Sequence, residues 1–378
     1  MTHLAICAFA MHVPSCNPAH ARDCQRIPND GVTCEDARKS DPRLFLEAIR
    51  SYPYRVRTVL EQLRALQSPR CELCPRRCGA DRATAPGFCG QPLALQVAAV
   101  CSHLGEEPPL SGRGGAGTVF VAGCTMRCRF CQNHQISQPE RLDPAWSRTP
   151  EQLARRFLEL ERAGSHNIEW VSPTQHLPGL VEALSLARRR GLSLPVVWNG
   201  NGYQRVSVLR LLEGIVDVYL PDAKYGERAA AAELSETPDY VEVSRRALLE
   251  MQRQVGPLEV DPATGLARRG MIVRHLVLPG RLANTREVLT WIARELGRDT
   301  WVSLMAQYYP AHRAAAAGAD GLGRRLGARE QRRALSALEA AGLENGWVQE
   351  RVTAGTFRPD FTRGDRAFEP RPAAREAP

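Results

Sequence analysis

The sequence predicts an α/β protein in which six strand–helix units form a partial (βα)6 barrel, preceded by a small N-terminal cysteine-rich metal module. From residue 118 onward, short apolar runs alternate with segments of helical periodicity, a pattern typical of a parallel sheet covered by helices. Six units suit an open barrel better than the closed, eight-unit kind. Four cysteines in tight spacing between residues 71 and 89 indicate the separate metal module.

Composition divides the 378 residues into four segments. Residues 1–40 carry widely spaced cysteines among Pro, Asn, Asp and Gly, without periodicity, and are expected to be disordered or a mis-started N-terminus. Residues 41–110 contain a helical stretch, at 41–67, and the four-cysteine metal module. Residues 111–350 form the barrel core. The Pro-, Arg- and Ala-rich residues 351–378 are expected to be a disordered tail.

Each element of the barrel has its own local signal. The first barrel helix begins at Thr149, Pro150 and Gln152, which make a capping box with proline in the first helical position. Later helices are expected at 178–190, 207–213, 240–255, 285–296 and 329–340. The strands are short apolar runs, expected at 118–122, 167–172, 194–198, 216–220, 271–278 and 300–305.

Three cysteines, Cys124, Cys128 and Cys131, follow the first barrel strand after the exit residue Gly123. Thiolates are soft ligands that suit iron–sulfur clusters or zinc. Ferredoxin-type spacings supply four thiolates to a four-iron cluster, whereas three leave one iron free to bind a small molecule. The spacing therefore predicts a [4Fe-4S] cluster with an open iron. The alternatives are a structural zinc loop or three thiols in the core.

A second set of thiols, Cys71, Cys74, Cys78 and Cys89, predicts another metal site. Four protein ligands close a coordination shell, as in structural metal sites. Spacing alone does not separate zinc from an auxiliary iron–sulfur cluster, and a closed structural role is slightly favoured.

Charge and cysteine usage narrow the class of protein. Lys and Arg number 50 against 41 Asp and Glu, and only Lys39 and Lys224 are lysines. The arginines are scattered along helices, which fits solvated faces better than a nucleic-acid groove. Twelve cysteines are too sparse for a disulfide scaffold and indicate a reducing cytoplasm. No apolar run reaches the ~18 residues of a membrane span, and the first residues lack signal-peptide features.

Polar residues collect where the predicted strands end, the edge at which parallel α/β proteins place reactive groups. Asp222 and Lys224 lie two residues apart on one strand, so they project to the same face. A lysine in an arginine-rich chain suggests that a compact point charge is needed there. His176 and His312 are weaker candidates. The expected catalytic pair is Asp222 and Lys224, and the expected cofactor-binding residues are Thr174, Asn199, Asp222, Lys224, Arg274 and Gln307.

Several longer motifs carry a family resemblance over residues 71–347. They include Cys-x2-Cys-Pro-Arg-x-Cys at 71–78, His-x-Gly-Glu-Glu-Pro at 103–108, and Ser-Gly-x-Gly-Gly-x-Gly-Thr at 111–118. Others are the cysteine triad with Gln132-Asn133, the Pro-Asp-x-Lys at 221–224, and Arg-His-Leu-Val-Leu-Pro-Gly at 274–280. Together they resemble the radical S-adenosylmethionine (SAM) superfamily, in particular an uncharacterised branch related to the pyruvate formate-lyase activating enzyme.

The resemblance implies an oxidoreductase with a [4Fe-4S] cluster whose open iron is chelated by SAM. Reductive cleavage of SAM then gives a 5′-deoxyadenosyl radical, which abstracts a hydrogen atom. Asp222 and Lys224 match the motif of the activating enzymes that contacts SAM. The superfamily's Gly-Gly-Glu segment, which holds the SAM amino group, is replaced here by Ser172-Pro-Thr174.

The same resemblance suggests partners. The favoured substrate is a glycine of a glycyl-radical protein, with a flavodoxin or ferredoxin-type electron donor. The alternatives are radical modification of a small molecule, a peptide or RNA, or a non-catalytic iron–sulfur electron-transfer protein. We expect a cytoplasmic protein without membrane partners and without a strong nucleic-acid signal.

Overall fold

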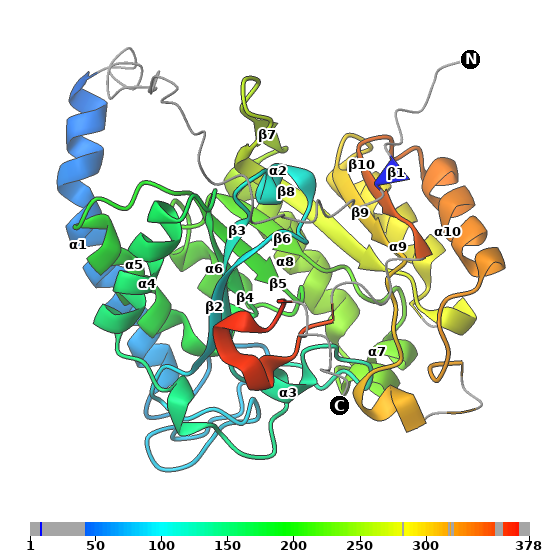
Figure 1. The fold of residues 1–378 in the computed structure, drawn as a ribbon, viewed down its shortest axis with the longest axis horizontal. Helices are drawn as coiled ribbons and strands as arrows, with labels where there is room; N and C mark the ends of the chain where they lie inside the picture. Colours follow the sequence, from blue (N-terminus) through cyan, green and yellow to red (C-terminus); the bar gives the residue numbers. More distant parts are fainter. Residues whose placement is uncertain are drawn as a thin grey trace, which may run out of the picture.

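The computed structural model describes residues 8–9, 42–281, 283–316, 318, 321–351 and 358–369. The predictions for residues 1–7, 10–40, 352–357 and 370–378 lie outside the described residues, and so do Cys7, Cys16, Cys24 and Cys34. Figure 1 shows a curved sheet with helices along its outer side.

Six parallel strands form the centre of the sheet and confirm the predicted fold class. They are β3 (Ala116–Val121), β4 (Ile168–Val171), β5 (Val196–Gly200), β6 (Val218–Pro221), β8 (Ala267–Leu276) and β9 (Trp301–Met305). Each pairs in parallel with the next in this order. The sheet stays open, so the units make a partial barrel.

Four further strands extend the described sheet beyond the six predicted units. β2 (Val97–His103) runs antiparallel to β3, and β10 (Gly346–Gln349) continues the parallel order beyond β9. The two-residue strands β1 (Ala8–Phe9) and β7 (Glu259–Val260) pair with β10 and β8. Three of them are only two to four residues long, and the seven-residue β2 lies outside the alternation of strands and helices that marked the barrel.

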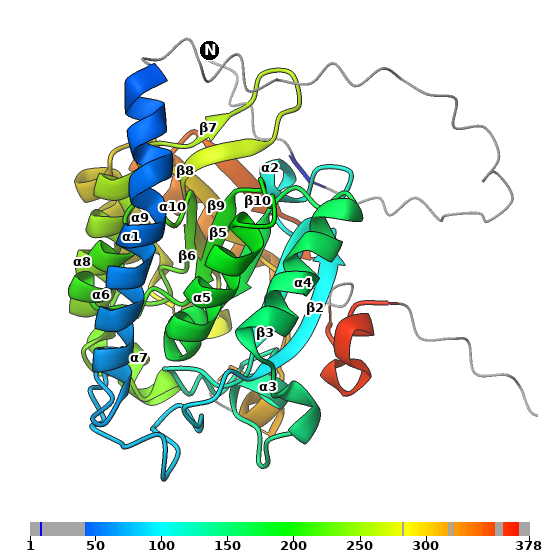
Figure 2. The ribbon, with the colours of Figure 1, turned by 90° about the vertical axis from the view of Figure 1, so that its left-hand side faces the viewer.

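Helices cover the outside of the sheet, as Figure 2 shows for α4 and α5, with α1 beside them. Thr149 and Gln152 form the expected capping box at the start of α4. The helix expected at 285–296 divides into an α-helical part and a π-helical part, Ile292–Leu296. The long helices are α1 (Pro42–Gln67), α4 (Pro150–Arg162), α5 (Leu177–Arg188), α6 (Val206–Leu211), α7 (Arg228–Ser235), α8 (Tyr240–Val255), α9 (Thr285–Trp291) and α10 (Ala328–Ala341).

Alternation along the strands separates an outer core from the barrel interior, because successive strand side chains point to opposite faces. Trp170, Trp198 and Tyr219 point outward into the main hydrophobic core under the helices. The short helix α2 (Pro108–Ser111) closes the barrel at the end where the parallel strands begin, called here the floor. Its Leu110 packs with inward-facing strand residues, among them Val197, Val218 and Ile272. The interior above this apolar floor is left for polar residues.

The C-terminal segment corrects one expectation of the sequence. Residues 358–369 are ordered against β2, with a 3-10 helix at Phe361–Arg366, so the predicted disorder of the tail is wrong for them. The ring of Phe120 lies 5.1 Å from that of Phe361 and 5.4 Å from that of Phe368. The Asp365 carboxylate accepts a hydrogen bond from the Val100 amide at 2.7 Å. These contacts join residues that are far apart in the chain, so no local sequence pattern predicts them.

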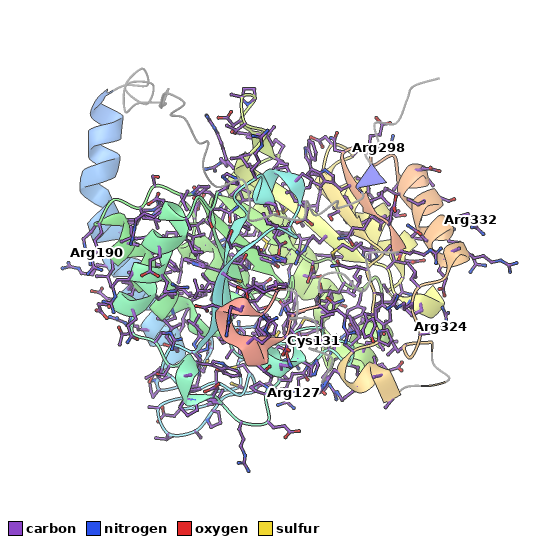
Figure 3. All side chains as sticks on the ribbon, viewed as in Figure 1. Arg127, Cys131, Arg190, Arg298, Arg324 and Arg332 are labelled. Carbon is purple, nitrogen blue, oxygen red and sulfur yellow. The ribbon has the colours of Figure 1, made fainter. Side chains whose placement is uncertain are left out.

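The positions of the labelled arginines on the surface agree with their scattered positions in the sequence. Figure 3 labels Arg190 and Arg332 at opposite ends of the molecule, with Arg127 near its lower edge. Within the described residues, no helix is both long and apolar enough to cross a membrane.

Candidate functional site

The cysteine loop begins where β3 ends, and its first turn requires glycine. Gly123 has a φ of 77°, in the left-handed region. A Cβ at this position would lie 2.3 Å from Gln91 Cγ and 2.6 Å from the Cys89 carbonyl oxygen. The backbone can therefore turn from the strand into Cys124 only because residue 123 has no side chain.

The three cysteines of this loop, which the sequence predicts to share a metal centre, line one cavity. Burial raises the pKa of each thiol, that of Cys131 to about 12, and nearby Lys224 opposes the shift at Cys124 and Cys128. Each sulfur also has a polar neighbour. These are Asn201 Nδ2 at 3.4 Å from Cys124, Ser235 Oγ at 3.0 Å from Cys128, and Ser137 Oγ at 3.1 Å from Cys131.

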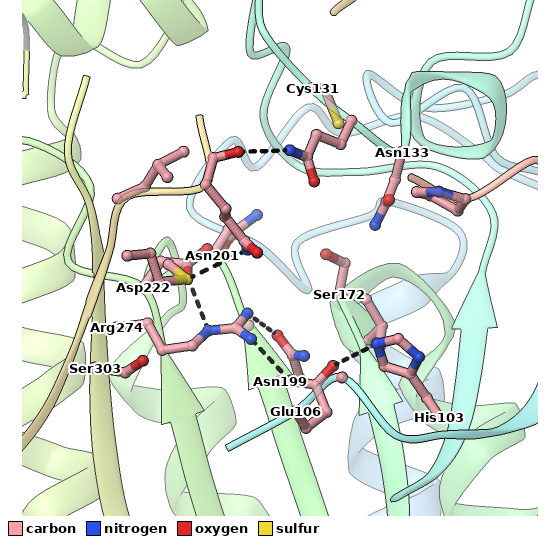
Figure 4. A pocket seen from close by; sticks show the side chains of 18 of the residues that line it. His103, Glu106, Cys131, Asn133, Ser172, Asn199, Asn201, Asp222, Arg274 and Ser303 are labelled. Atoms are coloured by element: carbon pink, nitrogen blue, oxygen red, sulfur yellow. Dashed lines mark hydrogen bonds and ion pairs between the residues drawn. The ribbon is translucent and has the colours of Figure 1, made fainter. Parts of the chain in front are cut away.

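A connected network of charged residues occupies the barrel interior beside the cysteines (Figure 4). Lys224 Nζ lies 2.6 Å from Asp222 Oδ2, and Arg274 Nε lies 3.3 Å from Asp222 Oδ1. Arg274 also donates to Asn199 Oδ1 at 2.6 Å. Burial disfavours the Asp222 carboxylate, but Lys224 and Arg274 outweigh it and lower its pKa. Tyr240 fixes the Asp222 backbone by donating to its carbonyl oxygen at 2.8 Å.

Arg274 lies within β8, two residues before the strand ends, and the expected strand at 271–278 also contained it. The strand continues to Leu276, and residue 274 forms a parallel bridge with Asp222. Alternation along β8 directs Arg274 into the barrel between apolar Ile272 and Leu276. A guanidinium therefore stands in the middle of the cavity.

Three glutamates around Arg274 are functional-site residues that sequence reasoning missed. Arg274 donates to Glu106 Oε2 at 3.1 Å, and Asn199 donates to Glu169 Oε1 at 2.6 Å. Burial raises the pKa of Glu106, Glu107 and Glu169. The His-x-Gly-Glu-Glu-Pro motif at 103–108 was the available signal for two of them. It was read only as part of the family resemblance.

The remaining predicted residues divide into two groups. Asn199 and Gln307 line the cavity, and Gln307 Oε1 accepts from Gln349 Nε2 at 3.3 Å. Thr174 is buried but is not among the residues that line the cavity, whereas Ser172 lines it. The reason is local: Ser172 takes a left-handed conformation with φ of 52°, and residues 173–176 then form a buried 3-10 helix outside the cavity lining.

The two candidate histidines lie outside the network. His176 is buried with its Nε2 at 3.3 Å from Gln91 Oε1, and burial together with Arg82 lowers its pKa. His312 stacks on His134 with ring centroids 5.0 Å apart.

The four-cysteine module lies directly against the cysteine loop. Arg76 Nε donates to the Thr125 carbonyl at 3.0 Å, and Arg127 donates to the Phe88 carbonyl at 3.2 Å. Both guanidinium groups stack on the Phe88 ring, at 4.0 and 4.2 Å from its centroid. The two cysteine-bearing loops are therefore held together by contacts that alternate between them.

The four thiols of the module influence one another, which places them near each other. Burial raises the pKa of Cys74 to about 12, and the charges of the three partner cysteines add to the shift. Cys89 in turn acts on Cys124 of the loop. Within the described residues, no three His, Cys, Asp or Glu side chains are arranged to hold a single metal ion.

Arg82 lies beside these thiols and has no carboxylate partner among the described residues. Its side chain is 1% exposed. Its guanidinium donates to the carbonyl oxygens of Gln91, Pro92 and Gln175 at 3.1, 2.6 and 2.8 Å, and approaches Cys71 Sγ at 3.9 Å. A buried cation is costly without a nearby negative charge.

Comparison with known proteins gives the following similarities. Residues 118–249 match the Radical SAM superfamily. The chain is 31% identical over 284 residues to the uncharacterised protein MJ0674 of Methanocaldococcus jannaschii, across 72% of this chain and 75% of that protein. A solved structure, HydG, a maturase of the [FeFe]-hydrogenase, aligns with 60% of this chain at a TM-score of 0.42 and 12% identity. The chain spans about half of that structure, 49%.

The open α/β barrel carries three cysteines directly after its first parallel strand, an arrangement that suits an iron–sulfur protein. The chain belongs to the radical SAM superfamily. Members of this superfamily are enzymes, and membership implies a [4Fe-4S] cluster and SAM. The donor set fits: Cys124, Cys128 and Cys131 present three soft sulfurs with polar neighbours to one cavity, and Lys224 supplies a positive charge nearby.

Proposed function

We propose that this protein cleaves SAM reductively and uses the resulting radical to abstract a hydrogen atom from a substrate. When bound, the cluster and SAM supply an electron and a 5′-deoxyadenosyl radical. The observation that carries the proposal is that the cysteine triad and the Asp222–Lys224–Arg274 network line one cavity.

The chain's own residues have defined tasks in this scheme. Cys124, Cys128 and Cys131 hold the cluster, and Lys224 provides a cation for the carboxylate of SAM. Asp222 positions Lys224 through their 2.6 Å ion pair. Buried side chains around the cavity keep bulk water from a reactive radical.

The direct test is the release of 5′-deoxyadenosine by anaerobically reconstituted protein with dithionite and SAM. Cys128→Ala should abolish release, because a cluster with two thiolates is lost. Cys101→Ala is the matched control, since Cys101 lies in β2 outside both cysteine sets. Equal turnover in Cys128→Ala would contradict the assignment.

Two kinds of substrate have support. The resemblance to the branch related to the pyruvate formate-lyase activating enzyme supports a glycine of a partner protein, with a flavodoxin or ferredoxin-type donor in a reducing cytoplasm. The buried charges in the cavity support a small charged molecule instead. Electron paramagnetic resonance on enzyme, SAM and a candidate glycyl-radical protein distinguishes them. A doublet on the partner favours activation, and SAM cleavage without one favours the small molecule.

We also propose that Cys71, Cys74, Cys78 and Cys89 bind a second metal centre, zinc or an iron–sulfur cluster. The buried, carboxylate-free guanidinium of Arg82 supports an anionic centre at this place. The contacts of Arg76 and Arg127 with the neighbouring loop mean that such a centre would also brace the cysteine triad.

A further inference from the structure

The floor of the cavity holds more carboxyl groups than cationic side chains among the described residues. Four carboxyl groups, those of Glu106, Glu107, Glu169 and Asp222, act on the single guanidinium of Arg274. Lys224 is the second cation, and it is engaged with Asp222. Burial, together with Arg274, lowers the pKa of His103 to about 4, so its imidazole adds no positive charge near neutral pH.

Glu107 has one carboxylate oxygen without a donor, although the Ser303 side chain hydrogen-bonds to its carboxyl group. Its side chain is 8% exposed, it lines the cavity, and its Oε2 atom has no hydrogen-bond partner. A buried carboxylate oxygen without a donor costs free energy unless a ligand supplies one. Glu106, its neighbour, already accepts from Arg274 at 3.1 Å. Glu107 therefore offers an acceptor to whatever enters the cavity.

The position of this pair separates it from the cysteine triad. Glu106 and Glu107 lie at the start of α2, the helix that closes the barrel at the end where the parallel strands begin. The triad lies beyond the opposite, C-terminal ends of the strands. One cavity is lined by both, and Arg274 and Asn199 stand between them. A molecule in the cavity can thus reach the carboxylates with one end while its other end faces the cysteines.

We propose that the Glu106–Glu107 end of the cavity binds a positively charged nitrogen group of the substrate, an ammonium or a guanidinium. This inference rests on the proposed function in one respect, because it takes the bound molecule to be the substrate. The binding site itself stands on the excess of carboxylates and the unpartnered Glu107 oxygen. Arg274 orients Glu106, and the cation of the ligand completes the bonding of Glu107. A cationic group held at the floor fixes which part of the molecule faces the radical.

The expected pH dependence follows from the groups that face the pair, which are His103, Glu169, Asp222, Lys224 and Arg274. Burial raises the pKa of both glutamates, so part of each population carries a proton in the empty cavity. A cationic ligand needs the ionised form, and its binding expels those protons. Affinity should therefore rise as pH increases, with measurable proton release. His103 and Lys224 keep their charge states near neutral pH and do not reverse this sign.

The test uses the anaerobically purified protein with butylammonium and butylguanidinium as probes, and butanol and butyrate as neutral and anionic controls. Titration calorimetry should detect the cations and neither control, with protons released. Glu107→Gln should weaken cation binding roughly 10- to 100-fold, the range expected for one charge-assisted hydrogen bond. Glu107→Asp, which keeps the charge, should retain part of the affinity. Glu140→Gln, at an exposed site, is the matched control.

Three outcomes overturn the inference. Equal binding of butanol and the cations would remove the need for charge. Unchanged cation affinity in a folded Glu107→Gln protein would place the site elsewhere. Loss of cation binding when SAM is added without reductant would assign the carboxylates to the cofactor. Because calorimetry needs no turnover, cation binding without 5′-deoxyadenosine release would contradict the proposed function alone, and release without cation binding would contradict this inference alone.

Discussion

Replacing the buried Arg82 tests whether the four-cysteine module holds an anionic metal centre. Arg82→Met keeps much of the side-chain volume but removes the charge and every donor. Three carbonyl oxygens, those of Gln91, Pro92 and Gln175, then lose the hydrogen bond that Arg82 donates. At about 1 kcal/mol for each hydrogen bond, the metal-free protein should lose about 3 kcal/mol.

A bound tetrathiolate centre should make the same substitution more costly. The guanidinium lies 3.9 Å from Cys71 Sγ. With an effective dielectric constant of about 20, opposite charges near this distance attract by about 4 kcal/mol, and by less when the charge is spread over several sulfurs. Arg82→Met should therefore cost about 2–4 kcal/mol more when metal is bound than when it is not.

The assay is urea unfolding of wild type and variants, under anaerobic conditions, with the module metal present and after chelation. Arg82→Lys is the matched control because it restores the charge but not the three carbonyl contacts. Its loss should be similar with and without metal. Equal losses for Arg82→Met in the two states would refute the reasoning, since the charge of Arg82 would then have no anionic partner to stabilise.

Further substitutions test the cysteine loop and the network. Lys224→Ala should weaken SAM binding by about 2 kcal/mol in calorimetry, and unchanged affinity would place this residue outside the SAM pocket. A protein with all three loop cysteines changed to Ala should still bind metal at the module, and stoichiometric analysis of zinc, iron and sulfide decides between zinc, a cluster and no site. Gly123→Ala should lower both the unfolding midpoint and the iron content, because its Cβ would lie 2.3 Å from Gln91 Cγ; a wild-type midpoint would show that the turn can relax. Asp222 has a lowered pKa, so its ionised form stabilises the folded protein fully above about pH 4, and this stabilisation is lost as pH falls through the folded pKa. Asp222→Asn should remove this pH dependence of the unfolding free energy in acid titrations. Parallel curves for wild type and variant would contradict the prediction.

The sequence by itself determined the order of the central elements and pointed to candidate metal ligands, because both are local properties of the chain. Apolar runs and helical periodicity record which face of a segment is buried, so the six central strands and the start of α4 at Thr149 followed directly. Cysteines that share a metal in one loop are close in sequence. The triad could therefore be recognised before any fold was known.

Only the tertiary structure decided what surrounds those ligands. Arg274 and Glu106 are 168 residues apart in the chain and come from different elements, so no local pattern joins them. Arg82 donates a hydrogen bond to the carbonyl of Gln175, which is 93 residues away in the chain. Phe361 packs on Phe120, although composition alone marks its segment as disordered. Thr174 shows the opposite case. Its strand-end position predicted a cavity residue, but it lies in the buried 3-10 helix that follows the left-handed turn at Ser172 and does not line the cavity. Charge balance in a buried cavity depends on such distant contacts, since it is the sum over every element that lines the cavity.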